Sequence, residues 1–234
     1  MKGDTSMLVE TTEIWLERFE AEKGVVWRHS GDARQPHPKL ASGRHADTLF
    51  DVGPIMANPK LADSVAEALL DMFPWDPPPN DKMKRYVVVG PAKGATKLAE
   101  LLSQEGGGCF GGEWFWASPT KNEEEGQKMM IFSPQELLRL PGSCVVPCED
   151  VITTGGTVGR AAAAARQAGA TILPFVLTLV NRSGRKEIDG REIVALVESP
   201  EETWAADECP LCGWDSEAVD PNIEENRKRL YASY

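Results

Sequence analysis

The chain lacks any long apolar run. Its 234 residues contain no segment that reaches the roughly 18 consecutive apolar residues of a membrane-spanning helix. The N-terminal stretch is acidic and has no apolar core, so we expect no secretory signal peptide. The five cysteines, an odd number, do not make a disulfide framework. We therefore expect a soluble protein of the reducing cytoplasm.

Positive charge is also scarce. There are 25 Lys and Arg residues against 36 Asp and Glu, which gives a formal net charge of −11. Such an acidic protein repels nucleic-acid backbones and anionic lipid, so neither nucleic acid nor a membrane is an expected partner. If the ligand is a polyphosphate, the few positive groups must be concentrated at one site.

Two common phosphate-binding motifs are missing as well. The absence of G-x-x-x-x-G-K-[ST] excludes a nucleoside-triphosphate P-loop. No strand is followed by G-x-G-x-x-G with an acidic residue further on, which disfavours a dinucleotide fold. A phosphate site in this chain must be built in another way.

What the sequence does contain is an alternation of apolar runs and helical patterns. Apolar runs predict buried strands at 85–90, 143–148, 171–180 and 192–198. Helical periodicity or composition predicts helices at 7–22, 61–73, 95–102 and 159–169. This alternation predicts an α/β fold, a mostly parallel sheet with helices on both faces. The polar stretch at 118–128 lacks apolar periodicity, and we expect it to be a mobile loop between two strands.

The most informative stretch is VVPCEDVITTGGTVGR at 145–160. An apolar strand ends in Glu149 and Asp150, and a loop of threonines and glycines then opens into a helix. Ligands of open α/β sheets sit beyond the carboxyl ends of the strands. Glycines let the backbone approach a phosphate, to which the helix start adds partial positive charge. The acidic pair suits ribose hydroxyls and a Mg²⁺ ion shared with the ligand. A tight structural turn would explain TTGG alone, but not this whole arrangement.

This stretch resembles the ribose-5-phosphate-binding signature of the type I phosphoribosyltransferases, namely four apolar residues, Glu-Asp, two apolar residues and Thr-Thr-Gly-Gly. The resemblance implies that Glu149 and Asp150 are catalytic residues that hold the ribose hydroxyls. It also implies that the loop binds the 5′-phosphate of 5-phosphoribosyl-1-pyrophosphate. The residues with this binding role are Val151, Ile152, Thr153, Thr154, Gly155, Gly156 and Thr157.

Two upstream segments are similar to parts of the orotate phosphoribosyltransferases. VVVGPAKGATKLAELL at 87–102 resembles their pyrophosphate loop, which implies a catalytic Lys93 and a Gly94 that lets the loop close. A surface lysine in a turn is the alternative interpretation. LASGRHADTLFDVG at 40–53 resembles the hood of that family, which implies base contacts from Arg44 and Phe50. The remaining residues assigned to phosphoribosyl pyrophosphate are Pro91, Ala92 and Lys121.

The resemblance implies a type I phosphoribosyltransferase fold with a small hood. We divide the chain into an N-terminal helix and hood (1–60), a phosphoribosyltransferase core (61–200) and a C-terminal tail (201–234). The implied reaction transfers ribose 5-phosphate to a nucleobase, with Mg²⁺ bound through the substrate and pyrophosphate released. By the same resemblance we expect a homodimer. The order of the segments favours orotate or a related pyrimidine as the acceptor.

Two other functions stay open. A purine-salvage transferase would share the ribose-phosphate motif, because that motif does not report the base. A non-catalytic sensor of phosphoribosyl pyrophosphate or of a nucleotide is favoured by the composition of the flexible segment, in which three glutamates stand between Lys121 and Lys128.

Cys209 and Cys212 form a single C-x-x-C pair in the tail. A structural zinc site usually needs a second such pair or histidines, and His29, His37 and His45 lie far away in the sequence. A pair of thiols in a turn is the simpler interpretation. A structural Zn²⁺, completed across a dimer, is the alternative.

Overall fold

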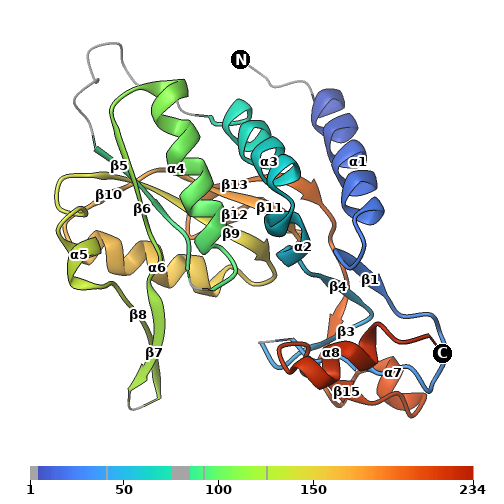
Figure 1. Ribbon diagram of the computed structural model, residues 1–234. Helices are drawn as coiled ribbons and strands as arrows, with labels where there is room; N and C mark the ends of the chain where they lie inside the picture. The colour runs from blue at the N-terminus through green and yellow to red at the C-terminus, as the bar shows by residue number, and fades with distance from the viewer. Residues whose placement is uncertain (1–4, 41, 75–84, 92, 125, 234) are drawn as a thin grey trace.

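A seven-stranded sheet forms the centre of the computed structural model (Figure 1), which describes residues 5–40, 42–74, 85–91, 93–124 and 126–233. Its strands lie in the order β12 (Glu187–Ile188), β13 (Arg191–Glu198), β11 (Phe175–Asn181), β9 (Cys144–Ile152), β5 (Arg85–Val89) and β6 (Glu113–Ala117), and β10 (Thr171–Ile172) also pairs with β9. All pairs are parallel except β12 with β13. The predicted fold class is confirmed.

Helices cover both faces of this sheet. Three of them, α1 (Thr5–Ala21), α3 (Pro59–Asp71) and α4 (Thr96–Phe110), lie on one side, and α6 (Gly156–Gln167) lies on the other. Successive side chains of a strand point to opposite faces. Accordingly Val146 packs in the cluster beneath α1, α3 and α4, whereas its neighbour Val145 packs against α6. Both faces of β9 are thus buried up to the point where its acidic pair begins.

Helix α4 continues well beyond the predicted end at residue 102, through the glycines at 106–108. Glycine weakens a helix interior, so its presence here needs a reason in the packing. Here a Cβ on Gly106 would lie 2.5 Å from Cε3 of Trp114. The glycine therefore lets the indole, which also stacks on Tyr86, pack directly against the helix backbone.

The stretch predicted to be a mobile loop is a two-stranded antiparallel hairpin. Its strands are β7 (Thr120–Glu124) and β8 (Gln127–Ile131), and Gly126 in the turn has a left-handed φ of 78°. The short helix α5 (Pro134–Leu137) follows and begins with a capping box formed by Ser133 and Glu136. Glu136 also accepts a hydrogen bond from the Ser118 amide at 2.5 Å, which anchors the base of the hairpin.

The tail residues pair with the hood. The elements before the core are β1 (Val26–Arg28), β2 (His37–Pro38), β3 (His45–Ala46), β4 (Thr48–Phe50) and α2 (Gly53–Ala57). The elements after it are β14 (Thr203–Trp204), α7 (Pro210–Gly213), β15 (Ala218–Val219) and α8 (Glu224–Leu230). Strand β2 pairs with β15 and β3 with β14. The indole N–H of Trp27 donates to the Leu230 carbonyl at 2.7 Å, so the hood and the tail form one structural unit (Figure 1).

Within the described ranges, no helix is both long enough and apolar enough to cross a membrane.

Candidate active site

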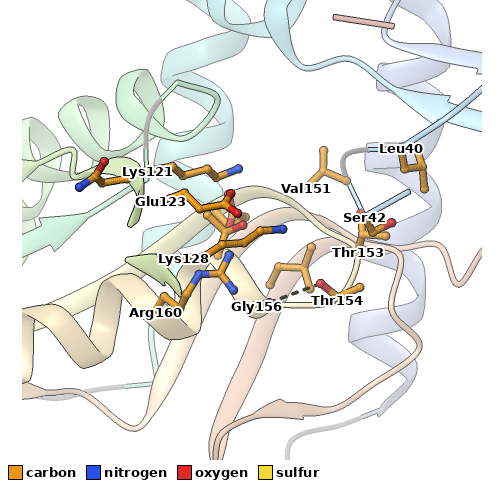
Figure 2. Close-up of a pocket in the computed structure, with 15 residues that line it drawn as sticks. Leu40, Ser42, Lys121, Glu123, Lys128, Val151, Thr153, Thr154, Gly156 and Arg160 are labelled. Carbon is orange, nitrogen blue, oxygen red and sulfur yellow. Dashed lines mark hydrogen bonds between the residues drawn. The ribbon is translucent and has the colours of Figure 1, made fainter. Parts of the chain in front are cut away.

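A cavity of about 660 Å³ opens at the carboxyl end of β9. The residues around it come from β9, the following loop, α6, the β7–β8 hairpin and the hood (Figure 2). They are Leu40, Ser42, Lys121, Asn122, Glu123, Lys128, Glu149, Val151, Ile152, Thr153, Thr154, Gly155, Gly156, Thr157 and Arg160. The position agrees with the rule that ligands of open α/β sheets bind beyond the carboxyl ends of the strands.

The loop between β9 and α6 forms the floor of this cavity. Gly155 has a left-handed φ of 76°, and a Cβ at this position would lie 2.4 Å from Cδ1 of Ile188, so both conformation and space require glycine. In the described part of the chain, no protein acceptor receives a hydrogen bond from the amides of Thr153 and Thr154. These amides and the N-terminus of α6 are available to an anionic ligand.

The acidic pair lies near the carboxyl end of β9. Its two side chains point to opposite faces of the strand. Glu149 lines the cavity. Asp150 faces the loop after β5, where a Cβ on Gly94 would lie 1.9 Å from its Oδ2. Asp150 Oδ1 also accepts from the amide of Val151 at 2.8 Å. The pair therefore sits between the loop after β9 and the loop after β5.

Burial raises the pKa of both carboxyl groups. The pKa of Glu149 rises to about 8, first because of burial and then because of the neighbouring charge of Asp150. Lys121 opposes this rise at both acids, and the amide of Val158 opposes it at Glu149. Because the charged forms are poorly solvated, the pair gains from hydroxyl donors or from a cation.

Three cationic side chains lie around the cavity. Lys121 and Lys128 come from the hairpin, and Arg160 lies one helical turn after Gly156 on α6 (Figure 2). The Nε atom of Arg160 is buried without a hydrogen-bond partner among the described residues. Glu123, which pairs with Lys128 across the hairpin, lies here too. The chain has a net charge of −11, so three cations at one cavity are a local concentration of positive charge. A polyphosphate ligand needs such a concentration.

The loop after β5 contributes differently from its expected role. Gly90 makes a tight turn, since a Cβ there would lie 2.4 Å from the Ala95 carbonyl oxygen. Pro91 is buried, and Ala92 lies outside the described residues. Lys93 is exposed and is not among the residues around the cavity. Among the described residues of this loop, Gly94 lies against the carboxylate of Asp150.

The two residues expected to contact the base do not line the cavity. Phe50 is buried in the core, because β4 pairs with β1 and presents this side chain inward, beneath the Arg182 guanidinium. Arg44 points to β14, where its Nε donates to Thr203 Oγ1 at 2.8 Å. In their place the hood contributes Leu40 and Ser42.

Sequence reasoning also missed Asn122, Glu123 and Arg160 as cavity residues. Only Arg160 carried a usable signal, because a residue four positions after Gly156 on a helix lies on the same face. The hairpin residues were hidden by the expectation of a loop. The two tail cysteines lie next to His37 and His45. They are therefore not the isolated pair of thiols that the simpler interpretation of the sequence describes.

The fold and the cavity together define an α/β protein whose cavity at a strand tip is suited to an anionic ligand. The family model described as "Phosphoribosyl transferase domain" matches residues 52–211. The chain therefore belongs to the phosphoribosyltransferase family.

Individual relatives agree with this assignment. The chain is 29% identical over 199 residues to an orotate phosphoribosyltransferase of Acidithiobacillus ferrooxidans, covering 84% of this chain and 93% of that protein. It is 28% identical over 196 residues to an orotate phosphoribosyltransferase of Heliobacterium modesticaldum, covering 84% and 94%.

Solved structures share the fold. Orotate phosphoribosyltransferase from Aeropyrum pernix superposes with a TM-score of 0.54 at 19% identity, covering 80% of this chain and 92% of that one. Adenine phosphoribosyltransferase from Thermoanaerobacter pseudethanolicus also gives 0.54, at 18% identity, covering 78% and 99%. The fold alone therefore does not distinguish a pyrimidine from a purine acceptor.

Proposed function

We propose that the protein transfers ribose 5-phosphate from phosphoribosyl pyrophosphate to orotate. One observation carries this proposal: Glu149, a threonine- and glycine-rich loop with unused amides and three cations meet at one cavity, with Asp150 next to Glu149 in the strand. Orotate is preferred over other bases because the relatives that cover most of the chain are named orotate phosphoribosyltransferases.

In the proposed reaction, a C1′–N bond forms between the ribose and a ring nitrogen of the base. The C1′–O bond to pyrophosphate breaks, pyrophosphate leaves with the electron pair, and the proton of the ring nitrogen goes to solvent. The loop at 153–157 would hold the 5′-phosphate, and Glu149 and Asp150 the ribose hydroxyls. Lys121, Lys128 and Arg160 would stabilise the charge that develops on pyrophosphate.

Mg²⁺ fits this site. Glu149 and Asp150 are half-buried carboxyl groups, the first at the cavity and the second next to it in the strand, and carboxylate, hydroxyl and phosphate oxygens are the ligands that this ion prefers. When bound with the substrate, the ion would supply charge neutralisation on the pyrophosphate. Lys93 remains a proposed pyrophosphate contact, which its exposed position in the loop after β5 leaves accessible.

A non-catalytic sensor is the second candidate. Glu123 favours it, because a carboxylate that lines the cavity repels the anion that a transferase must enclose. Lys128, which stands opposite Glu123 in the register of the hairpin, carries the opposite charge and also lines the cavity. A sensor would bind phosphoribosyl pyrophosphate but would not release pyrophosphate with any base.

The test measures pyrophosphate release with phosphoribosyl pyrophosphate, Mg²⁺ and one base at a time, using orotate, uracil, adenine, hypoxanthine and guanine. We expect release with orotate and its loss in the double variant Glu149→Gln, Asp150→Asn. The matched control is Asp63→Asn, Glu67→Gln on the exposed face of α3, which should keep full activity. Release with a purine alone would identify a salvage enzyme, and binding without release would identify a sensor.

A homodimer in the cytoplasm completes the proposal. The odd number of cysteines favours a reducing compartment, because it does not suit a disulfide framework. Light scattering during gel filtration should give twice the mass of the 25.6 kDa chain. The mass of a single chain would overturn the dimer and leave the proposed activity untouched.

A further inference from the structure

Four potential metal ligands converge where the tail meets the hood, away from the catalytic cavity. His37 lies on β2 and His45 on β3, while Cys209 caps the N-terminus of α7 and Cys212 lies within it. The pairing of β2 with β15 and of β3 with β14 brings these segments together from opposite ends of the sequence (Figure 1). One donor atom from each residue lies within 4.8 Å of all the others.

Four of the six separations between these donor atoms are close to the edges of a metal-centred tetrahedron. Tetrahedral zinc, with Zn–N bonds of about 2.0–2.1 Å and Zn–S bonds of about 2.3 Å, places two nitrogens about 3.4 Å apart and a nitrogen about 3.6 Å from a sulfur. His37 Nε2 lies 3.2 Å from His45 Nδ1. Cys209 Sγ and Cys212 Sγ lie 3.5 and 3.6 Å from His37 Nε2, and Cys212 Sγ lies 3.3 Å from His45 Nδ1.

Hydrogen bonding among the four groups does not account for this packing. Three donor atoms approach His37 Nε2 within 3.6 Å. A neutral ring nitrogen has either one proton or one lone pair, so it can make one good hydrogen bond. A cation at the centre would use the lone pairs of all four atoms at once.

A neighbouring hydroxyl fixes the ring of His37 in the orientation that binding requires. Ser216 Oγ donates to the Gln35 carbonyl at 2.6 Å. His37 Nδ1 lies 2.9 Å from Ser216 Oγ. Because the hydroxyl proton is already committed, Nδ1 carries the ring proton and donates to Ser216. The lone pair of His37 is then on Nε2, the atom that faces the cysteines. Metal-bound histidines commonly have such a partner on the other nitrogen.

We propose that His37, His45, Cys209 and Cys212 bind one Zn²⁺ ion within a single chain. Two thiolates and two imidazoles in a tetrahedron are typical of a structural zinc site. His37, His45 and Cys209 are buried and Cys212 is half-buried, which leaves no open position for a substrate. The assignment replaces the expectation of an isolated thiol pair and needs no second chain.

The ion would hold a hairpin that reaches the catalytic cavity. His37 and His45 stand at the two ends of the segment that carries Leu40 and Ser42, and the Leu40 amide donates to the Arg44 carbonyl at 2.8 Å across it. Because Leu40 and Ser42 line the cavity, the site would fix one wall of it. This consequence rests on the proposed function, whereas zinc binding itself does not.

The first test is elemental analysis of the full chain purified without chelator. We expect about one zinc per chain, falling below about a tenth in the variant Cys209→Ser, Cys212→Ser and in His37→Gln. The control is Cys109→Ser, an exposed cysteine outside the cluster, which should keep its zinc. Unchanged zinc in the double variant, stoichiometric iron, or a Cys209–Cys212 disulfide in the purified protein would overturn the proposal.

A second measurement does not depend on whether the variants fold. Replacement of the metal by Co²⁺ in the wild-type chain should give the visible bands of a tetrahedral ion together with thiolate-to-cobalt bands in the near ultraviolet. A spectrum of hexahydrated Co²⁺ would count against the site. A wild-type chain that releases pyrophosphate but binds no zinc would refute only this inference. The reverse result would refute only the proposed function.

Discussion

Gly94 lies directly against Asp150, so close that a Cβ on the glycine would stand 1.9 Å from the carboxylate Oδ2. The contact joins the loop after β5 to the tip of β9, and these strands are neighbours in the sheet. The position of the acidic pair therefore depends on the absence of a single methyl group in the adjacent loop.

We expect Gly94→Ala to reduce kcat/KM for phosphoribosyl transfer by at least about tenfold, because the new methyl group must displace either the loop or the carboxylate, and small misplacements are costly in catalysis. The matched control is Gly108→Ala on α4, where a Cβ would meet nothing within 4 Å. Steady-state pyrophosphate release would compare the two. Equal activity would show that the Gly94 contact does not position Asp150.

Gly155 tests how the loop floor is built. Alanine there combines a left-handed φ of 76° with a collision against Ile188, whereas Gly190 has a similar φ of 73° and open space. We expect Gly190→Ala to lower the free energy of unfolding by about 1 kcal/mol and Gly155→Ala by about 2–4 kcal/mol. Urea unfolding would measure both. Equal losses would mean that the backbone strain, and not Ile188, sets the cost.

The raised pKa of Glu149 predicts a particular dependence of stability on pH. Between the ordinary pKa of 4.5 and the folded value of about 8, the folded protein holds a proton that the unfolded chain has released. The contribution of Glu149 to the free energy of unfolding should therefore fall as the pH rises through this window. Asp150, whose pKa is also raised, contributes in the same direction.

Urea unfolding without substrate or Mg²⁺, at several pH values from 5 to 8, would measure this slope. Glu149→Gln should flatten it, because the amide does not titrate. The control Glu187→Gln, an exposed residue of β12, should leave it unchanged. The same slope in Glu149→Gln and in the wild type would contradict the raised pKa of this carboxyl group.

The sheet and the floor of the cavity could be predicted because their signals are local. An apolar run ends in Glu149 and Asp150 and continues into a glycine-containing loop. This single continuous stretch predicts the strand, the turn and the start of the helix. The same holds for β5 and the turn at Gly90. The parallel arrangement followed from the alternation of strands and helices.

The missed features depend on contacts between distant segments. The hairpin sequence has too little apolar alternation to predict strands. The two strands are held together by backbone pairing, which the side-chain pattern does not show. The resemblance implies a contact between Phe50 and the nucleobase. Position in a motif, however, does not report which face of β4 is buried. The His37–Cys209 proximity joins residues 172 positions apart. Only the pairing of the two chain ends reveals it.

Arg160 offers the sharpest test of the anion site. Its Nε is buried without a partner among the described residues, so an anionic ligand would complete its hydrogen bonding. A charge-assisted hydrogen bond contributes about 1.5–3 kcal/mol, and its loss corresponds to an increase of roughly ten- to hundredfold in Kd. We expect Arg160→Gln to weaken the binding of phosphoribosyl pyrophosphate by this factor, as measured by calorimetry.

Arg166→Gln is the matched control, because Arg166 is exposed in the last turn of the same helix. It removes the same charge from the chain, and we expect its Kd to change by less than about twofold since exposed charges are well screened. If both variants weaken binding equally, the effect comes from net charge. If neither does, the ligand binds away from α6, and the assignment of the cavity to the sugar pyrophosphate is wrong.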